Sequence, residues 1–162
     1  EIPVSIFILI MIGSLFLIKN NFNALIISHY FVIGGAIASF IATLLFQRNI
    51  ISAPVWMIVV GAGLYLGYVP FNSMFFDRMI ATFKYVSNVG FLIYLVDSFG
   101  YLGSTLMMLF KNFFYSTLDW LNFFEYSVYF GSITIVVFTF LSSRYFTNKY
   151  KEFEYDAKLV QD

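Results

Sequence analysis

Five long runs of apolar residues dominate this chain and limit the folds that it can adopt. They cover residues 2–18, 24–46, 50–76, 85–110 and 126–143. A helix needs roughly 20 apolar residues to cross the hydrocarbon layer of a membrane, and none of the runs alternates with the period of two that is typical of a barrel strand. Only 11% of the residues are charged, against about 25% in an ordinary soluble domain. We therefore predict an all-α, polytopic bundle of five transmembrane helices.

Two shorter segments differ from these runs. Residues 112–124 place polar and aromatic side chains on opposite sides at helical spacing, which is typical of a helix lying in the membrane interface. Residues 148–162 form a charged tail that we expect to be solvated and partly disordered. No linker rich in Pro, Gly or Ser divides the chain, so we predict one transmembrane domain, residues 1–147, followed by this tail.

Composition and motifs exclude several classes of function. The chain has no cysteine, which excludes disulfides, thiolate metal sites and thiol catalysis. It contains no nucleotide-binding loop, dinucleotide fingerprint or zinc motif. We therefore expect the lipid bilayer as the main partner, with no cofactor, metal or nucleic acid. The first residue is Glu1 and no charged segment precedes the first run, so we interpret the chain as part of a longer protein.

Basic residues predict the orientation in the membrane, because loops rich in Lys and Arg stay in the cytoplasm. In the five-helix arrangement Arg48 and Lys111 lie on one side, and seven basic residues lie on the other. The C-terminus is therefore predicted to be cytoplasmic. The seven are Lys19, Arg78, Lys84, Arg144, Lys149, Lys151 and Lys158.

Asp97 is the strongest candidate for a functional residue. It is the only charged residue in the run 85–110, and a carboxylate at membrane depth is costly enough that a working site is its default explanation. The alternative is a structural hydrogen bond between two helices. Residues spaced 4, 3, 4 and 3 apart place it on a stripe of small and hydroxyl-bearing side chains: Gly90, Tyr94, Asp97, Tyr101 and Ser104.

A second polar stripe follows the run 50–76. Gly61, Tyr65, Tyr68 and Asn72 are spaced 4, 3 and 4 apart, so they share one helix face. If this stripe faces the Asp97 stripe, the two line a polar seam at membrane depth. Packing alone is the usual role of such aromatic residues.

The cytoplasmic end of this run suggests a gate. Pro70 leaves a carbonyl without its helical donor, which predicts a kink or a moving part. Asp77 and Arg78 fall in the charged connection that follows, where they could form an ion pair, although surface pairs contribute only about 0 to 1 kcal/mol. We predict a gating loop formed by Pro70, Asp77 and Arg78.

Other features have less specific interpretations. His29, the only histidine, lies about one turn inside the run 24–46, where an interfacial position is more common than a proton relay. Small residues at close-contact spacing are typical of packing between membrane helices. They are Gly34, Ala38, Ala42, Gly63, Gly67, Gly100 and Ser104.

Three motifs between residues 61 and 103 carry a resemblance to a known family. They are YVPFN at 68–72, FDR at 76–78 and YLVDSFGYLG at 94–103. With them the chain resembles an uncharacterised family (a domain of unknown function) of bacterial membrane proteins grouped with the major facilitator superfamily. The resemblance covers about a quarter of the chain.

This resemblance implies twelve helices in two halves, cytoplasmic termini, a place in the inner membrane of a bacterium and alternating access around a central cavity. The five runs would be the eighth to twelfth helices, and the N-terminal half would be the missing partner. One motif departs from the superfamily: the connection 19–23 lacks the Gly-x-x-x-Asp-Arg-x-Gly signature, and Asp77-Arg78 stands in a different connection without glycines.

We therefore expect a secondary transporter for an unknown small molecule, in which Asp97 couples protons or contacts substrate. An assembly partner, sensor or lipid-handling protein with the same fold is the alternative, and an intramembrane enzyme is the least favoured. The residues expected to shape the cavity around Asp97 are Tyr65, Tyr68, Asn72, Tyr94, Ser98 and Tyr101.

Overall fold

The computed structural model describes residues 2–117 and 119–159, and it is helical throughout, with no strand among them. Four of its helices are long and apolar enough to cross a membrane. The predicted all-α fold is confirmed, and the four helices are compatible with the predicted membrane bundle. The elements are α1 (Ile2–Phe16), α2 (Asn21–Gln47), α3 (Ala53–Pro70), a π-helical turn η1 (Phe71–Phe75), α4 (Phe76–Phe83), α5 (Val89–Phe114) and α6 (Trp120–Leu159).

The fifth predicted span is not confirmed, because α1 has only 15 residues. At about 1.5 Å per residue it extends roughly 22 Å, less than the hydrocarbon layer of about 30 Å. Its buried residues recur at helical spacing, and they pack as one face against α3. The first helix therefore belongs to the bundle, although its length does not reach that of a full span.

Polar residues define where the long helices begin and end. Asn20 and Asn88 cap α2 and α5, each accepting a hydrogen bond from the backbone N–H three residues later, at 3.0 and 3.3 Å. Lys84 ends α4 in the left-handed conformation, with φ 54°. The chain is therefore able to reverse direction without a proline or glycine at these positions.

The prediction of an interfacial helix over 112–124 is wrong, because the described residues of this range do not form a single helix. Residues 112–114 end α5, residues 120–124 begin α6, and the chain reverses between them. Polar residues at both helix ends produce the same alternating pattern as one amphipathic helix. Residue 118 lies outside the described residues.

The charged tail is also not a disordered segment. Helix α6 continues without a break from Trp120 to Leu159, well past the predicted end at 143. Tyr150 stacks on Phe22 of α2 at 3.9 Å between ring centroids, and Glu154 pairs with Lys158 at 3.4 Å. The polar end of α6 is therefore helical because it packs on the bundle. Residues 160–162 lie outside the described residues.

Helices α3 and α4 form one continuous 31-residue rod that passes through η1. The predicted gating loop is consequently wrong: Pro70 ends α3, whereas Asp77 and Arg78 lie in the first turns of α4. Pro70 has no backbone N–H to donate. The rod continues past it by forming a π-helical turn directly after Pro70. No break in the helix is needed.

The backbones of α2 and α3 meet at two glycines. A Cβ on Gly35 would lie 2.9 Å from the Gly63 carbonyl oxygen, and one on Gly63 would lie 2.5 Å from that of Gly35. Such a close approach excludes any larger residue. Of the predicted small residues, Gly63 makes this contact, whereas Gly34 and Gly67 have open space around them.

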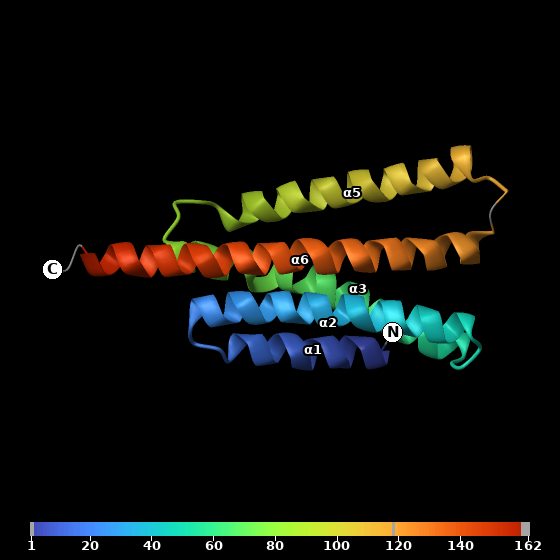
Figure 1. Ribbon diagram of the computed structural model, residues 1–162, viewed down its shortest axis with the longest axis horizontal. Helices are drawn as coiled ribbons and strands as arrows, with labels where there is room; N and C mark the ends of the chain where they lie inside the picture. The colour runs from blue at the N-terminus through green and yellow to red at the C-terminus, as the bar shows by residue number, and fades with distance from the viewer. Residues whose placement is uncertain (1, 118, 160–162) are drawn as a thin grey trace.

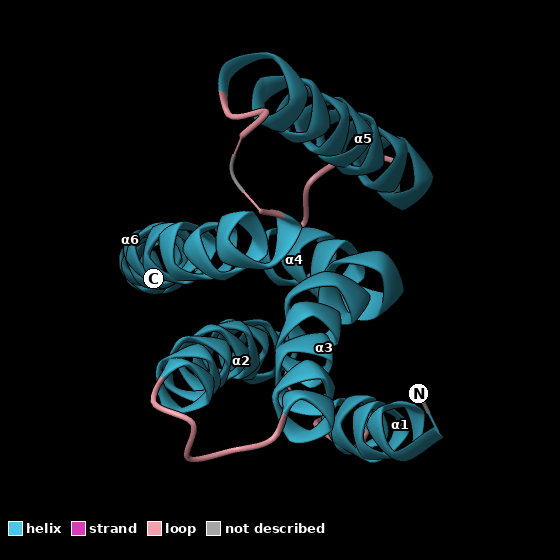
Figure 2. Ribbon diagram, turned by 90° about the vertical axis from the view of Figure 1, so that its right-hand side faces the viewer, coloured by secondary structure: helices cyan, strands magenta, loops and turns pink. Residues whose placement is uncertain are grey.

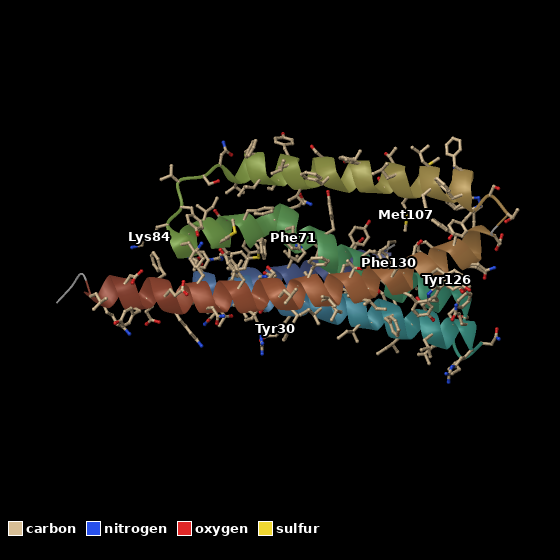
Figure 3. The ribbon with its side chains drawn as sticks, turned by 45° about the horizontal axis from the view of Figure 1, so that its top comes forward. Tyr30, Phe71, Lys84, Met107, Tyr126 and Phe130 are labelled. Atoms are coloured by element: carbon tan, nitrogen blue, oxygen red, sulfur yellow. The ribbon has the colours of Figure 1, made fainter. Side chains whose placement is uncertain are left out.

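Helix α2 is the centre of the bundle, with α3 on one side and α6 on another (Figure 2). Helix α5 stands apart from these helices, as Figure 1 shows. Its substantial contact is with α4, and Lys111 is its one buried residue among those described. Figure 3 labels Met107, Tyr126 and Phe130, which line a groove between α5 and α6. Helix α5 therefore exposes nearly its whole surface.

The turn between α1 and α2, the connection between α4 and α5, and the C-terminal end of α6 lie at one end of the molecule (Figure 1). Five of the seven basic residues counted above lie in these segments, and Arg78 of α4 bonds to Asn21 at the start of α2. The connections with Arg48 and Lys111 lie at the opposite end. The up-and-down order assumed for the charge count is thus present, and the cytoplasmic assignment remains a prediction.

Candidate functional site

The two polar stripes meet where Tyr68 of α3 reaches Asp97 of α5. The Tyr68 hydroxyl lies close enough to the Asp97 carboxylate for the two groups to interact, and the Asn72 amide lies beside the same hydroxyl. The sequence spacing thus identified two faces that the structure places together.

Asp97 has no counter-ion in this cluster. Its side chain is half-buried, and no Lys, Arg or His nitrogen of the described residues lies within 4.0 Å of it. Beside it, Nδ2 of Asn72 is buried and has no hydrogen-bond partner among the described residues. An unpaired carboxylate and an unused amide donor therefore share one site, and each of them lacks a partner that a ligand or water would supply.

The other predicted cavity residues surround this pair less closely. Tyr101 is near enough to interact electrostatically with Tyr68. Tyr65, Tyr94 and Tyr101 are all more than half exposed. The Ser98 hydroxyl donates to the carbonyl of Tyr94 at 2.7 Å, within its own helix, so its proton is already used. The cluster has a tyrosine-rich, open rim rather than a closed wall.

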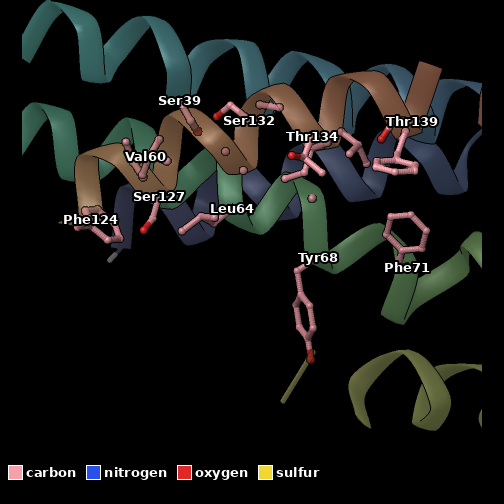
Figure 4. Close-up of a pocket in the computed structure, with 18 residues that line it drawn as sticks. Ser39, Val60, Leu64, Tyr68, Phe71, Phe124, Ser127, Ser132, Thr134 and Thr139 are labelled. Carbon is pink, nitrogen blue, oxygen red and sulfur yellow. The ribbon is translucent and has the colours of Figure 1, made fainter. Parts of the chain in front are cut away.

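Beside the cluster lies a pocket that the sequence did not predict. It has a volume of about 550 Å³, lies between α2, α3 and α6, and has Tyr68 and Phe71 among its lining residues. Figure 4 shows Tyr68 extending away from the other lining side chains. No charged residue lines it. Three distant helices form this pocket, so no local pattern could have revealed it.

Six residues of the pocket wall carry hydroxyl groups, and three of these groups are satisfied within their own helices. Ser39, Ser127 and Thr134 donate to the carbonyls four residues earlier at 2.9, 2.7 and 2.8 Å. These side chains present mainly their carbon atoms and a lone pair to the pocket. The surface is therefore mostly apolar.

The π-helical turn lies next to the site. Phe71 lines the pocket and packs on Phe75 at 4.4 Å between ring centroids, and Asn72 follows it in the same turn. Single π turns occur frequently at functional sites. This turn connects the polar cluster with the aromatic core below it, which also contains Phe76 and Phe83.

The predicted gate residues do not form an ion pair. Asp77 is exposed, and Arg78 donates instead to Asn21 Oδ1 at 2.6 Å. Pro70 is fully buried in the rod. Arg78 therefore ties α4 to the start of α2, and Asp77 has no salt-bridge partner among the residues described.

His29 is buried between α2 and α6 rather than lying at the interface. Its Nδ1 lies 2.8 Å from the Leu25 carbonyl and its Nε2 lies 3.0 Å from Ser142 Oγ. A carbonyl only accepts, so Nδ1 carries a proton, and Nε2 shares a second hydrogen bond with the Ser142 hydroxyl. Phe75 and Phe146 pack around the ring. This arrangement locks two helices together.

The described residues contain no group of three His, Cys, Asp or Glu side chains that could hold a metal ion. A family model with the description "Family of unknown function (DUF5690)" matches residues 1–149. Comparison with curated proteins and with solved structures gives no match.

Proposed function

We propose, for a chain that belongs to the DUF5690 family of unknown function, that it forms most of the C-terminal half of a secondary transporter of the major facilitator type. Its helices are those of a membrane protein. The transport activity, the N-terminal half as partner and the bacterial inner membrane are parts of this proposal. The resemblance of residues 61–103 to that superfamily is what suggests them.

The contact between Tyr68 and Asp97 is the observation that carries the proposal. It joins a helix of the bundle to one that stands apart from it, and it does so near the middle of α5. A carboxylate without a cation is costly in that position. Natural sequences retain such a residue at membrane depth chiefly for pathways of substrates or protons.

The geometry suggests how the site would work. The Asp97 carboxylate lies next to the Tyr68 hydroxyl, where it attracts a cation or a proton. Helix α5 has few contacts that oppose a movement away from α3. Occupation of the site would then be coupled to the distance between α5 and the bundle, which is the requirement for alternating access.

The test compares Asp97→Asn with Asp119→Asn in the full-length gene product. Asp119 carries the same group in the connection before α6, outside the site. Asp97→Asn should abolish or uncouple proton-driven uptake at unchanged membrane levels, whereas Asp119→Asn should leave it unchanged. Equal uptake by both variants and the wild type would exclude Asp97 from the transport cycle.

A second candidate is a facilitator-like protein without transport, acting as an assembly partner, sensor or lipid-handling protein. The connection between α1 and α2 favours it, because residues 17–20 are few and lack the superfamily's signature. Cysteines introduced beside Asp97 distinguish the two candidates. Protection of these cysteines from labelling by a transported solute would argue against the second.

A further inference from the structure

We infer that the site binds an amphipathic organic cation, with its charged group against Asp97 and its apolar body in the pocket beside Tyr68. The inference rests on the proposed function and specifies its substrate class. Two adjoining features carry it, namely an anionic cluster on one side of Tyr68 and an uncharged pocket on the other.

The charge of the ligand follows from Asp97. Its carboxylate interacts with the Tyr68 hydroxyl and has no cationic nitrogen within 4.0 Å among the described residues. A partly desolvated carboxylate is stabilised most by a paired cation. Nδ2 of Asn72, which is buried without an acceptor, can donate only to an acceptor atom on the body of the ligand and not to its cationic group.

The tyrosines strengthen the preference for a cation. Tyr65, Tyr68, Tyr94 and Tyr101 recur on the two facing stripes, and their rings are more than half exposed. The face of an aromatic ring attracts a cation, with roughly 0.5–2 kcal/mol for each well-placed contact. An anion would find neither a Lys nor an Arg in the pocket wall.

The pocket determines the rest of the ligand. Its volume of about 550 Å³ suits a small organic molecule. Half of the six hydroxyls in the wall, those of Ser39, Ser127 and Thr134, already donate to backbone carbonyls, which reduces the number of donors for a sugar or another polyol. A body of hydrocarbon or aromatic rings matches this wall better than a polar one.

Two probes of equal shape and opposite charge test the inference on the purified full-length gene product in detergent. Tetraphenylphosphonium should bind, and tetraphenylborate should bind at least tenfold more weakly. Asp97→Asn should weaken the binding of tetraphenylphosphonium at least tenfold, whereas Asp119→Asn should leave it unchanged. Equal binding of both probes to the wild type would overturn the inference, and this comparison needs no variant.

The pocket is tested separately by filling it. Gly67 lines the pocket and has nothing within 4 Å of an added Cβ, so Gly67→Leu should fit the fold and occupy the space. This substitution should weaken the binding of tetraphenylphosphonium at least fivefold. It should leave the binding of tetramethylammonium unchanged, because that ion is small. The control is Gly34→Leu, at an equally open glycine outside the pocket. Equal effects of both leucines would refute a pocket-bound ligand.

These binding measurements are independent of transport. Cation binding without uptake would support this inference and contradict the proposed transport activity. If uptake depends on Asp97 but the protein binds the two tetraphenyl ions equally, the transport proposal is supported and this inference is contradicted. Asp97 would then be assigned to proton coupling. Each result therefore decides one statement without deciding the other.

Discussion

At Gly63 the packing of two membrane helices depends on the absence of a single side-chain carbon. The neighbours of a Cβ there would be the Gly35 carbonyl and Ser39 Oγ, and Ser39 is held by its own bond to that carbonyl. The contact is therefore rigid on both sides. Gly67, one turn further along α3, has no such neighbours.

Gly63→Ala should destabilise the protein by about 1–3 kcal/mol, because α2 and α3 must move apart to admit the methyl group. Gly67→Ala, the matched control, should change stability by less than half as much. The measurement is the thermal unfolding midpoint of each purified variant in the same detergent. Identical midpoints for the two variants would contradict the backbone contact.

Sequence spacing was most informative for residues that share a helix face. The stripes of Tyr68 and Asp97 were predicted from a period of 3.6 residues, and the structure places both residues in one cluster. The partners of Gly63 could not be predicted in this way, since several small residues of α2 fit the same pattern. Only the rotation of α2 about its axis decides that Gly35 is the contact.

At the scale of elements, the polar end of α6 is held in place by aromatic contacts. Tyr150 stacks on Phe22 with nearly parallel rings, 8° apart, and Phe153 packs edge-on against Phe83. Charge composition predicted a disordered tail because it ignores such partners in other helices. The contacts explain why the helix continues to Leu159.

Tyr150→Ala should lower the stability of this extension, because a stacked ring pair contributes about 0.5–1.5 kcal/mol beyond its buried area. Tyr155→Ala removes the same side chain at an exposed position and is the control. Hydrogen exchange of residues 148–159 should become faster in the first variant alone. Unchanged exchange in Tyr150→Ala would show that the stacking does not hold the helix.

Helix type was predictable from hydropathy, whereas helix ends were not. Runs of apolar residues identified the four long helices, and Asn20 and Asn88 stand at the starts of α2 and α5. The start of α6 follows Asp119, whose Oδ2 accepts from the Leu121 N–H at 3.3 Å, and the passage through Pro70 depends on backbone hydrogen bonding in the π-helical turn. Neither leaves a distinctive signal in hydropathy.

For the whole molecule, the position of α5 is the main result. The helix is tied to the bundle near its start, where Val89, Leu92 and Ile93 pack against an aromatic cluster. Beyond that point its sides are exposed, apart from the half-buried Asp97 and the buried Lys111. The sequence predicted a membrane helix here but could not predict how few neighbours it has within this chain.

A double-cysteine variant tests this placement, and the chain has no native cysteine to interfere. Tyr68→Cys with Asp97→Cys should be cross-linked in membranes by a short bifunctional reagent, because the two side chains meet. The control pair is Tyr68→Cys with Phe99→Cys, two residues further along α5 and on another face of the helix. Equal cross-linking of both pairs would show that α5 rotates freely.

The π-helical turn between α3 and α4 has a consequence for movement. Its hydrogen bonds span one more residue than those of an α-helix, so the rod carries a spare residue between Pro70 and Phe76. Conversion of that turn to ordinary α-helical geometry would rotate α4 about the helix axis by roughly 100°, which is the angle that one residue contributes to a helix. The aromatic rings that follow Asn72 in the chain would then contact different residues, whereas α3 would keep its present contacts. The spare residue thus lies in the same turn as Asn72, whose buried Nδ2 has no partner among the described residues.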